Sequence, residues 1–296
     1  MRPFVYSCAW LVVLAFTSGC PTPPAVPDGG VSDGGVDDGG VSDGGVDDGG
    51  QPQVVTAVID SVCPPSERLG LLKVGQEGSL SFSVELYDRP QPWMAQAADS
   101  SDACDLFVFA EGCACDVGET CDSDGNCIPA PVEHAVTVTA SVGGDEEVFP
   151  PPANSVGGHW GTLTLPSDNL AFTLATDDLV IEVPAMSLPS SVPVQMTQTG
   201  TFESPIVDLS WSAPDDVGTH MATTIPINHH VGSPTHTRCV VDADAEALHV
   251  EGDLVDVLAV ITGLEFQTME HTRFASATLD EGCVDIRFLT YSYPQW

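Results

Sequence analysis

The stretch SLSFSVEL, residues 79–86, sets the expected fold class of this chain. Its apolar residues Leu80, Phe82, Val84 and Leu86 alternate with three serines and a glutamate. A two-residue period of this kind is typical of a β-strand with one buried face and one solvated face. The stretch VTVTASV, residues 136–142, has the same period. We therefore expect a mainly all-β protein.

Further short strands are expected along the chain, separated by turn-forming residues. They fall at residues 54–62, 105–110, 161–165, 170–174, 179–183 and 192–196. A final hairpin is expected over 271–279 and 283–291, with Asp280-Glu281-Gly282 as its turn. Short strands at this spacing favour a sandwich or a barrel. One short helix is expected over 254–262, because an apolar stripe at helical spacing ends there at Gly263.

The chain beyond residue 53 is expected to form two β-sandwich-like domains. The first, residues 54–202, carries a cysteine-rich insert at 104–129, and the joint is expected at 200–204. In the second, residues 203–296, the stretch IVDLSWSAPDD (206–216) places Val207, Leu209 and Trp211 on one face of a strand. This stretch resembles the second strand of a fibronectin type III or immunoglobulin-like sandwich. The resemblance implies an immunoglobulin-like β-sandwich but does not identify a ligand.

The N-terminus has the features of an export signal. Arg2 precedes the apolar run CAWLVVLAF, residues 8–16, which is too short to span a bilayer. Ser18, Gly19 and Cys20 resemble the lipobox of a bacterial lipoprotein signal. The resemblance implies a signal peptide over residues 1–19 and a lipid on Cys20 that anchors the chain to a membrane. A plain secretory signal and a retained membrane anchor are the alternatives, and all three place the remaining chain outside the cytoplasm.

Residues 20–53 are expected to be a disordered tether. The sequence VSDGGVDDGG occurs twice in tandem, at 31–40 and 41–50, and it offers almost nothing that could form a core. Calcium-binding β-roll repeats are the alternative for this Asp/Gly-rich segment. Those repeats have a nine-residue period, whereas the period here is five within ten.

The chain is strongly acidic, with a formal net charge of −36 over 296 residues. Residues 51–296 contain 36 acidic and six basic residues, and Lys73 is the only lysine. Nucleic acid and anionic lipid surfaces are therefore poor partners, because binding them requires Lys and Arg. A self-repelling soluble surface, adaptation to high salt and cation binding remain open explanations of the acidity.

Eight cysteines follow the N-terminal segment, and in an exported chain an even number predicts a disulfide framework. They are Cys63, Cys104, Cys113, Cys115, Cys121, Cys127, Cys239 and Cys283. The stretch CACDVGETCDSDGNCIP, residues 113–129, resembles the small cysteine-rich knots of EGF-like modules and of bacterial surface lipoproteins. We expect the bridges Cys113–Cys121, Cys115–Cys127, Cys63–Cys104 and Cys239–Cys283. Zinc binding by this cluster is an alternative, although it requires thiolates.

Two groups of residues are candidate metal ligands, although we expect no cofactor. Asp122, Asp124 and Asn126 are spaced like the start of an EF-hand loop, but the sixth position is Cys127 where that loop requires glycine. The second group is His229, His230 and His236, whose spacing matches no standard ligand pattern. The plainer interpretations are a stapled polar turn and exposed loop histidines.

No known catalytic motif occurs in the sequence: the chain has no G-x-S-x-G, H-E-x-x-H, Walker or dinucleotide-binding pattern. We therefore expect a non-enzymatic, lipid-anchored surface protein that is structural or binds an envelope or extracellular protein or a glycan. A divalent-cation (calcium or zinc) binding module is one alternative. An extracellular hydrolase that uses paired carboxylates is the other.

Overall fold

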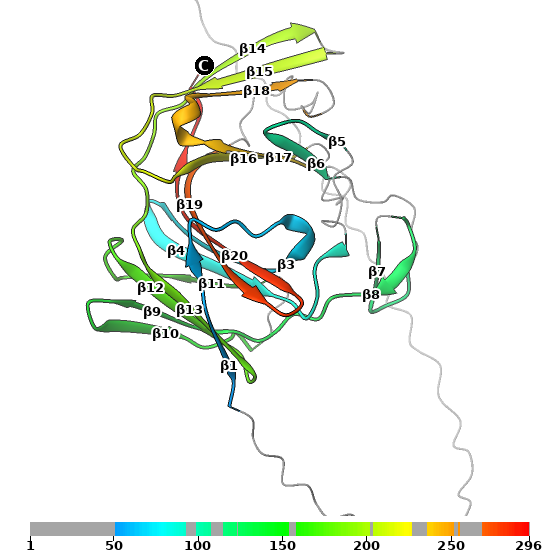
Figure 1. Ribbon diagram of the computed structural model, residues 1–296, viewed down its shortest axis with the longest axis vertical. Helices are drawn as coiled ribbons and strands as arrows, with labels where there is room; N and C mark the ends of the chain where they lie inside the picture. The colour runs from blue at the N-terminus through cyan, green and yellow to red at the C-terminus, as the bar shows by residue number, and fades with distance from the viewer. Residues whose placement is uncertain are drawn as a thin grey trace, which may run out of the picture. The chain divides into compact units, whose positions relative to one another are not determined.

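Figure 1 shows the computed structural model of the chain. The described residues are 51–92, 99–107, 115–122, 124–153, 158–201, 204–226, 236–251, 254 and 268–295, and they fall in one unit, Gly49–Trp296. The predicted signal peptide, Cys20 and the tether up to residue 50 lie outside the described residues. So do Cys113, His229 and His230, and the predicted helix over 254–262 apart from Leu254.

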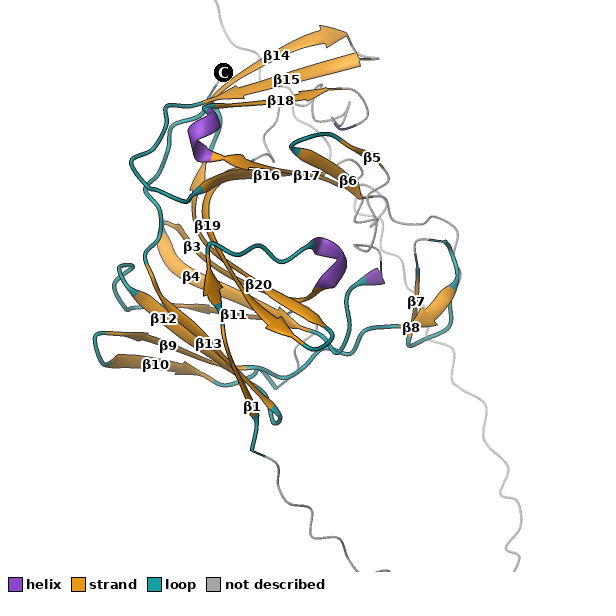
Figure 2. Ribbon diagram, viewed as in Figure 1, coloured by secondary structure: helices purple, strands orange, loops and turns teal. Residues whose placement is uncertain are grey.

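The fold is all-β, as predicted, and a ten-stranded sheet dominates it (Figure 2). Its order is β11 (His159–Thr162), β4 (Ser79–Leu86), β3 (Arg68–Glu77), β20 (Gly282–Ser292), β19 (Met269–Leu279), β16 (His220–Pro226), β17 (His236–Asp242), β6 (Cys104–Phe107) and β5 (Asp99–Ser100), and β2 (Val58–Ile59) also pairs with β19. We call it the long sheet. The hairpin β19–β20 at its centre confirms the predicted final hairpin and its turn.

Three smaller sheets complete the described fold. One contains β1 (Gln53–Thr56), β13 (Leu179–Met186), β12 (Leu170–Ala175), β9 (Thr137–Val142) and β10 (Asp145–Phe149). Another contains β14 (Gln195–Thr201), β15 (Ser204–Ser210) and β18 (Ala247–Glu251), and the third pairs β7 (Glu119–Cys121) with β8 (Cys127–Pro129). The 3-10 turns η1 (Pro65–Glu67) and η3 (Ala243–Ala245) are short. Within the described ranges, no helix has the length and apolar character needed to cross a bilayer.

The alternating stretch 79–86 forms β4 as expected, and its apolar side chains enter the larger of two cores. This core lies between the long sheet and the five-stranded sheet. Phe172 of β12 stands at its centre, with ring centroids 6.2 Å from Phe82 and 5.8 Å from Phe288. Residues 136–142 face the same core with Val138 and Ala140 fully buried, because their two-residue period also matches the pleat.

A second core lies between the three-stranded sheet and the other part of the long sheet. Val207, Leu209 and Trp211 are all buried in it, which confirms that they share one strand face. Met221 and Met269 contribute from the long sheet. The indole Nε1 of Trp211 donates to the carbonyl oxygen of Ala243 at 2.7 Å, so the ring is buried without an unpaired donor.

The strands do not divide where the sequence suggested, at residues 202/203. β20 pairs in parallel with β3, so the last strand of the chain lies beside one of the first. The expected joint at 200–204 instead connects the hairpin β14–β15, in which Thr201 faces Ser204. The reason is that β19 is long enough to contribute to both cores, with Ala275 in the first and Met269 in the second.

Several predicted strands have different bounds in the structure. The region 54–62 divides into β1 and β2, and Asp60 beyond them has a positive φ of 60°. The strand predicted at 192–196 begins only at Gln195, because Pro193 has no N–H to donate to a ladder. The strand predicted at 161–165 is β11, which begins and ends earlier. The sequence analysis missed β3.

Two of the predicted disulfides are wrong and one is confirmed. Cys63 bonds to Cys283 and Cys104 bonds to Cys239, whereas Cys63–Cys104 and Cys239–Cys283 were expected. The sheet order explains the difference, because Cys104 of β6 and Cys239 of β17 are register partners on adjacent strands. Cys115–Cys127 forms as predicted. Cys121 is disulfide-bonded, and its expected partner Cys113 lies outside the described residues.

Candidate functional site

Both cores lie against the same face of the long sheet. Met269, Ala275 and Ala277 occupy alternate positions of β19 and all enter a core, so the residues between them point to the other face. We call this opposite face the inner face. On β20 it carries Asp285 and Arg287, which alternate with apolar core residues.

The long sheet curls so strongly that distant strands meet over its inner face. The register runs from Cys239 of β17 through β16 and β19 to Ser292 of β20. In a flat sheet, three strand spacings and the seven residues from Ser292 back to Asp285 would separate the Cα atoms of Asp285 and Cys239, the neighbour of Arg238, by roughly 27 Å. Yet Arg238 Nη2 lies 3.8 Å from Asp285 Oδ2. Figure 1 shows the bending of β19 and β20 that makes this contact possible.

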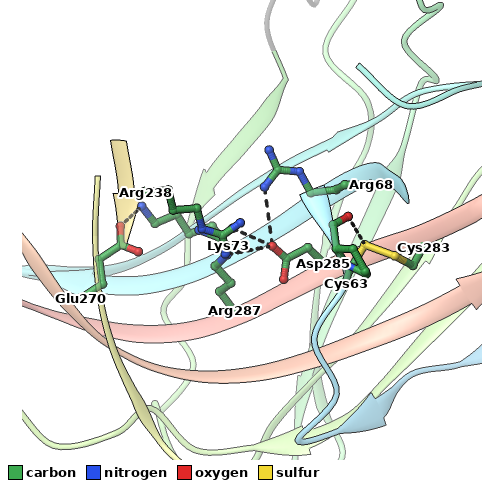
Figure 3. A network of polar contacts seen from close by, with 9 residues as sticks. Cys63, Arg68, Lys73, Arg238, Glu270, Cys283, Asp285 and Arg287 are labelled. Atoms are coloured by element: carbon green, nitrogen blue, oxygen red, sulfur yellow. Dashed lines mark hydrogen bonds and ion pairs between the residues drawn. A yellow bond between two sulfur atoms is a disulfide. The ribbon is translucent and has the colours of Figure 1, made fainter. Parts of the chain in front are cut away.

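Three guanidinium groups converge on Asp285, which is fully buried (Figure 3). Its Oδ2 accepts hydrogen bonds from Arg287 Nε at 3.0 Å and from Arg287 Nη2 at 2.6 Å. Arg68 Nη1 lies 3.7 Å and Arg238 Nη2 3.8 Å from the same oxygen. Among the described groups, Oδ1 of Asp285 and Nε of Arg238 are buried and have no hydrogen-bond partner.

A second ion pair on the inner face joins Lys73 of β3 to Glu270 of β19. Burial acts to lower the pKa of Lys73, but the Glu270 carboxylate and the Tyr291 hydroxyl together outweigh it and raise that pKa. The Lys73 ammonium also lies 5.2 Å from the centroid of the Tyr291 ring. Arg287 similarly lies 5.8 Å from the ring of Phe274, so aromatic faces support both cations.

We call these six residues, Arg68, Lys73, Arg238, Glu270, Asp285 and Arg287, the inner cluster. The cluster contains four of the six basic residues between 51 and 296. Burial, and then repulsion from Arg287, lowers the pKa of Arg238 to about 9, so it still carries its charge at neutral pH. Chemically, the inner cluster supplies fixed positive charge and hydrogen-bond donors in a largely buried environment. Guanidinium and ammonium groups that stay protonated cannot act as general bases.

A cavity of about 310 Å³ adjoins the inner cluster at Arg238. Val62, Pro65 and both disulfides that join distant strands contribute to its wall. Asp102 and Asp105 also line it, so positive and negative groups face the same space.

The turn containing Asp122, Asp124 and Asn126 connects β7 to β8. Backbone N–H groups of this turn donate hydrogen bonds to the Asp122 carboxylate. Oδ1 accepts hydrogen bonds from the N–H groups of Asp124 at 2.9 Å and Asn126 at 2.8 Å. Asn126 Nδ2 donates to Oδ2 at 3.1 Å. These bonds, the backbone N–H of Asn126 first, lower the pKa of Asp122. The geometry is that of a stapled polar turn.

The remaining metal candidates do not converge in the described part of the chain. Ligand atoms of Cys115, Glu119 and Cys127 lie within 4.8 Å of one another, but the two sulfur atoms form a disulfide and are not thiolates. His236 lies on β17 with its ring centroid 5.4 Å from that of Phe107.

Sequence reasoning missed the inner cluster, although part of its signal was visible. Asp285 and Arg287 are opposite charges two residues apart, flanked by Val284, Ile286 and Phe288. A charge pair that shares one strand face within an apolar run indicates two buried faces, one of them polar. Nothing in the sequence pointed to Arg238, because the curl of the sheet is what brings it to Asp285.

Comparisons with known proteins identify no family. No family model matches the chain, and no curated protein matches it. A chicken structure described as the CNTN1 FN1–FN3 domains is 9% identical with a TM-score of 0.20, and the match covers 79% of this chain and 66% of that one. A structure described as the structural basis of neurohormone perception by the receptor tyrosine kinase Torso is 11% identical with a TM-score of 0.16. That match covers 66% of this chain and 71% of that one. These TM-scores are too low to support any inference.

The chain is therefore a disulfide-bonded, β-rich protein. Three disulfides connect described residues, and two of them close very long loops. Disulfides of this kind persist in oxidising compartments, which indicates an extracytoplasmic location.

Proposed function

We propose that this chain is a lipid-anchored, extracytoplasmic protein that binds a basic partner through its acidic outer surface and catalyses no reaction. The proposed anchor is a lipid on Cys20. Residues 20–53 would then act as a flexible acidic spacer, with a span of roughly 30 Å or more between the membrane and the folded part. The disulfide framework supports export.

The observation that supports the proposal is that most basic residues lie in the inner cluster, whereas the acidic residues dominate the outer surface. Four of the six basic residues after residue 50 belong to the inner cluster, so they contribute little to the surface that a partner meets. Of the other two, Arg89 is neutralised by Asp88 at 2.8 Å. The outer surface is consequently almost purely anionic. Such a surface attracts basic partners at long range and repels acidic ones.

The pKa shifts of carboxylates favour binding over hydrolysis. A catalytic acid needs a pKa raised by burial or by a like charge. A hydrogen bond from Arg89 lowers the pKa of Asp88, which lines a cavity of about 290 Å³ together with Asp178 and Asp280. At Asp216, burial acts to raise the pKa, but hydrogen bonds from Ser190 and the charges of His271 and Arg273 together lower it. Neither carboxylate therefore has the raised pKa that the catalytic acid of the hydrolase alternative requires.

Anchoring is tested by expressing the full chain in a bacterium with a labelled fatty acid. Label and membrane association should both appear for the natural chain and both disappear for Cys20→Ala. An unlabelled natural chain, or a Cys20→Ala chain that remains in the membrane fraction, would refute the anchor.

Binding is tested with the oxidised mature chain and two unstructured peptides of equal length, one alternating lysine with serine and one alternating glutamate with serine. The lysine peptide should bind, with an affinity that falls steeply as salt rises, because the attraction is between charges. The glutamate peptide should not bind. Failure of the lysine peptide at low salt, or equal binding of both peptides, would refute a surface selective for basic partners.

A further inference from the structure

Among the described strands, β11 forms one edge of the long sheet. β11 begins the strand order and pairs only with β4 among the described strands. The N–H of Leu163 donates to the carbonyl of Leu80 at 2.9 Å, so 163 and 80 are a hydrogen-bonded pair. Because such pairs alternate, the N–H and C=O groups of Trp160 and Thr162 point away from β4. They form a ready template for one more strand.

A tryptophan stands at this open edge. The Trp160 side chain is 76% exposed, on the inner-face side of the sheet opposite Ser83. Soluble proteins commonly protect an open edge with lysine, proline or a covering segment. A large exposed aromatic ring does the opposite, because tryptophan is the residue most enriched where interfaces gain their binding energy.

The surroundings of Trp160 are negatively charged. A cavity of about 180 Å³ lies between Trp160, Leu71 and Glu85. Glu133 reaches the same end of β11, where its Oε1 accepts a hydrogen bond from the N–H of Gly158 at 2.9 Å. Burial raises the pKa of the nearby Tyr87, and the charges of Glu85 and Glu133 raise it further. The two carboxylates thus act together on Tyr87, and Glu85 also lines the cavity at Trp160.

We propose that the edge of β11 accepts an extended, basic segment of a partner protein as an additional strand. The proposal rests on the proposed function, since it identifies where the acidic surface holds its basic partner. The backbone groups of Trp160 and Thr162 pair with the segment. A lysine or arginine of the segment lies against the Trp160 ring, which attracts cations through its face, and Glu85 and Glu133 neutralise the charge.

Charge decides between this occupant and the alternatives. A second copy of the chain would bring two anionic surfaces together, each with an excess of thirty negative charges in residues 51–296. The chain's own segment 20–53 contains seven aspartates and no basic residue, so the carboxylates beside Trp160 repel it. A basic strand from another protein satisfies both the hydrogen-bonding groups and the charge.

The test uses the oxidised mature chain and three capped nine-residue peptides. The first alternates lysine and threonine, the second is identical but N-methylated at every backbone amide, and the third replaces lysine by glutamate. Trp160→Ala is compared with Tyr293→Ala. Tyr293 is a matched control because it is also an exposed aromatic side chain next to a carboxylate, that of Glu77, but lies beyond the end of β20.

We expect the first peptide to bind best and to slow hydrogen exchange at the amides of Trp160 and Thr162. Trp160→Ala should weaken binding about tenfold, since a partly desolvated cation–aromatic contact contributes on that scale. Tyr293→Ala should leave binding unchanged, and N-methylation should abolish it because methyl groups block the strand ladder. The glutamate peptide should not bind.

The outcomes separate a failure of the β11 site from a failure of the proposed function. If the N-methylated peptide binds as well as the first, or if both variants behave alike, the acidic surface still binds basic segments but the β11 edge is not the site. If no lysine peptide binds at low salt, the proposed function fails as well. A dimer of the chain alone that Trp160→Ala dissociates would assign the edge to a second copy and overturn the proposal.

Discussion

Replacing Asp285 by asparagine is the sharpest test of the inner cluster. Asp285 is fully buried and is the only carboxylate within 4 Å of the guanidinium groups of Arg68, Arg238 and Arg287 among the described residues. Asparagine keeps the size and one acceptor oxygen but removes the charge. Three buried cations would then face one another without the carboxylate that holds them together.

The expected cost follows from the geometry. Arg287 loses a charge-assisted pair of hydrogen bonds at 2.6 and 3.0 Å, and the repulsion among the three guanidinium groups is no longer offset. Removing one partner of a buried ion pair typically costs roughly 3–5 kcal/mol. For a folded region of this length, that corresponds to a fall of about 10 °C in the unfolding temperature.

The assay is urea unfolding of the oxidised mature chain, followed by circular dichroism, because urea does not screen charges. Arg89→Gln is the control, since it breaks the exposed Asp88–Arg89 pair and should barely move the midpoint. Adding Arg238→Met to Asp285→Asn should recover part of the loss by removing one unpaired cation. An Asp285→Asn midpoint equal to that of the natural chain, or no recovery in the double variant, would refute the reasoning.

Three further predictions concern other parts of the fold. Replacing Cys63 and Cys283 together by alanine should lower the free energy of unfolding by about 5 kcal/mol, because their bridge closes a loop of 220 residues; non-reducing peptide maps lacking this bridge would contradict the premise. Trp211→Phe removes the 2.7 Å hydrogen bond to the carbonyl of Ala243, which keeps only the backbone N–H of Glu246 at 3.5 Å. It should cost roughly 1–3 kcal/mol in urea unfolding, and an unchanged midpoint would count against it. Burial lowers the pKa of His271, so the unfolded chain binds more protons below about pH 6.5 and stability should fall there as pH decreases. His271→Gln should lose less stability than the natural chain across that interval, and parallel curves would show that His271 contributes nothing.

The strands could be predicted because their signal is local. The alternation in 79–86 and 136–142 is written in neighbouring residues, and the pleat converts it directly into one buried face. The same holds for the final hairpin, whose turn residues stand between two apolar runs. Trp211 could be assigned to a core for this reason, since Val207 and Leu209 precede it at a spacing of two.

The pairing of strands could not be predicted, because it depends on contacts between distant residues. Cys104 has Cys239 as its partner only because β6 lies next to β17, an adjacency that no local pattern encodes. The pairing of β3 with β20 likewise joins the two ends of the described chain. The inner cluster depends on both the strand order and the curl, so its members are spread from Arg68 to Arg287.

The inner cluster and the open edge of β11 are linked by the way charge is distributed over one sheet face. Lys73 of β3 lies opposite Ser83 of β4, and Ser83 lies opposite Trp160 of β11, so one row of register partners runs from the cluster to the edge. Towards the cluster, the row is cationic, and the half-buried Lys73 is paired with Glu270. At the edge, Glu85 lines the same cavity as Trp160, and Glu133 accepts a hydrogen bond from Gly158 just before β11. A buried ion cluster seldom stabilises a fold more than apolar packing would. The consequence of the inner cluster for binding is instead that its cations are held away from the edge. A lysine or arginine of a partner therefore meets carboxylates and an aromatic face there, without competition from these cations.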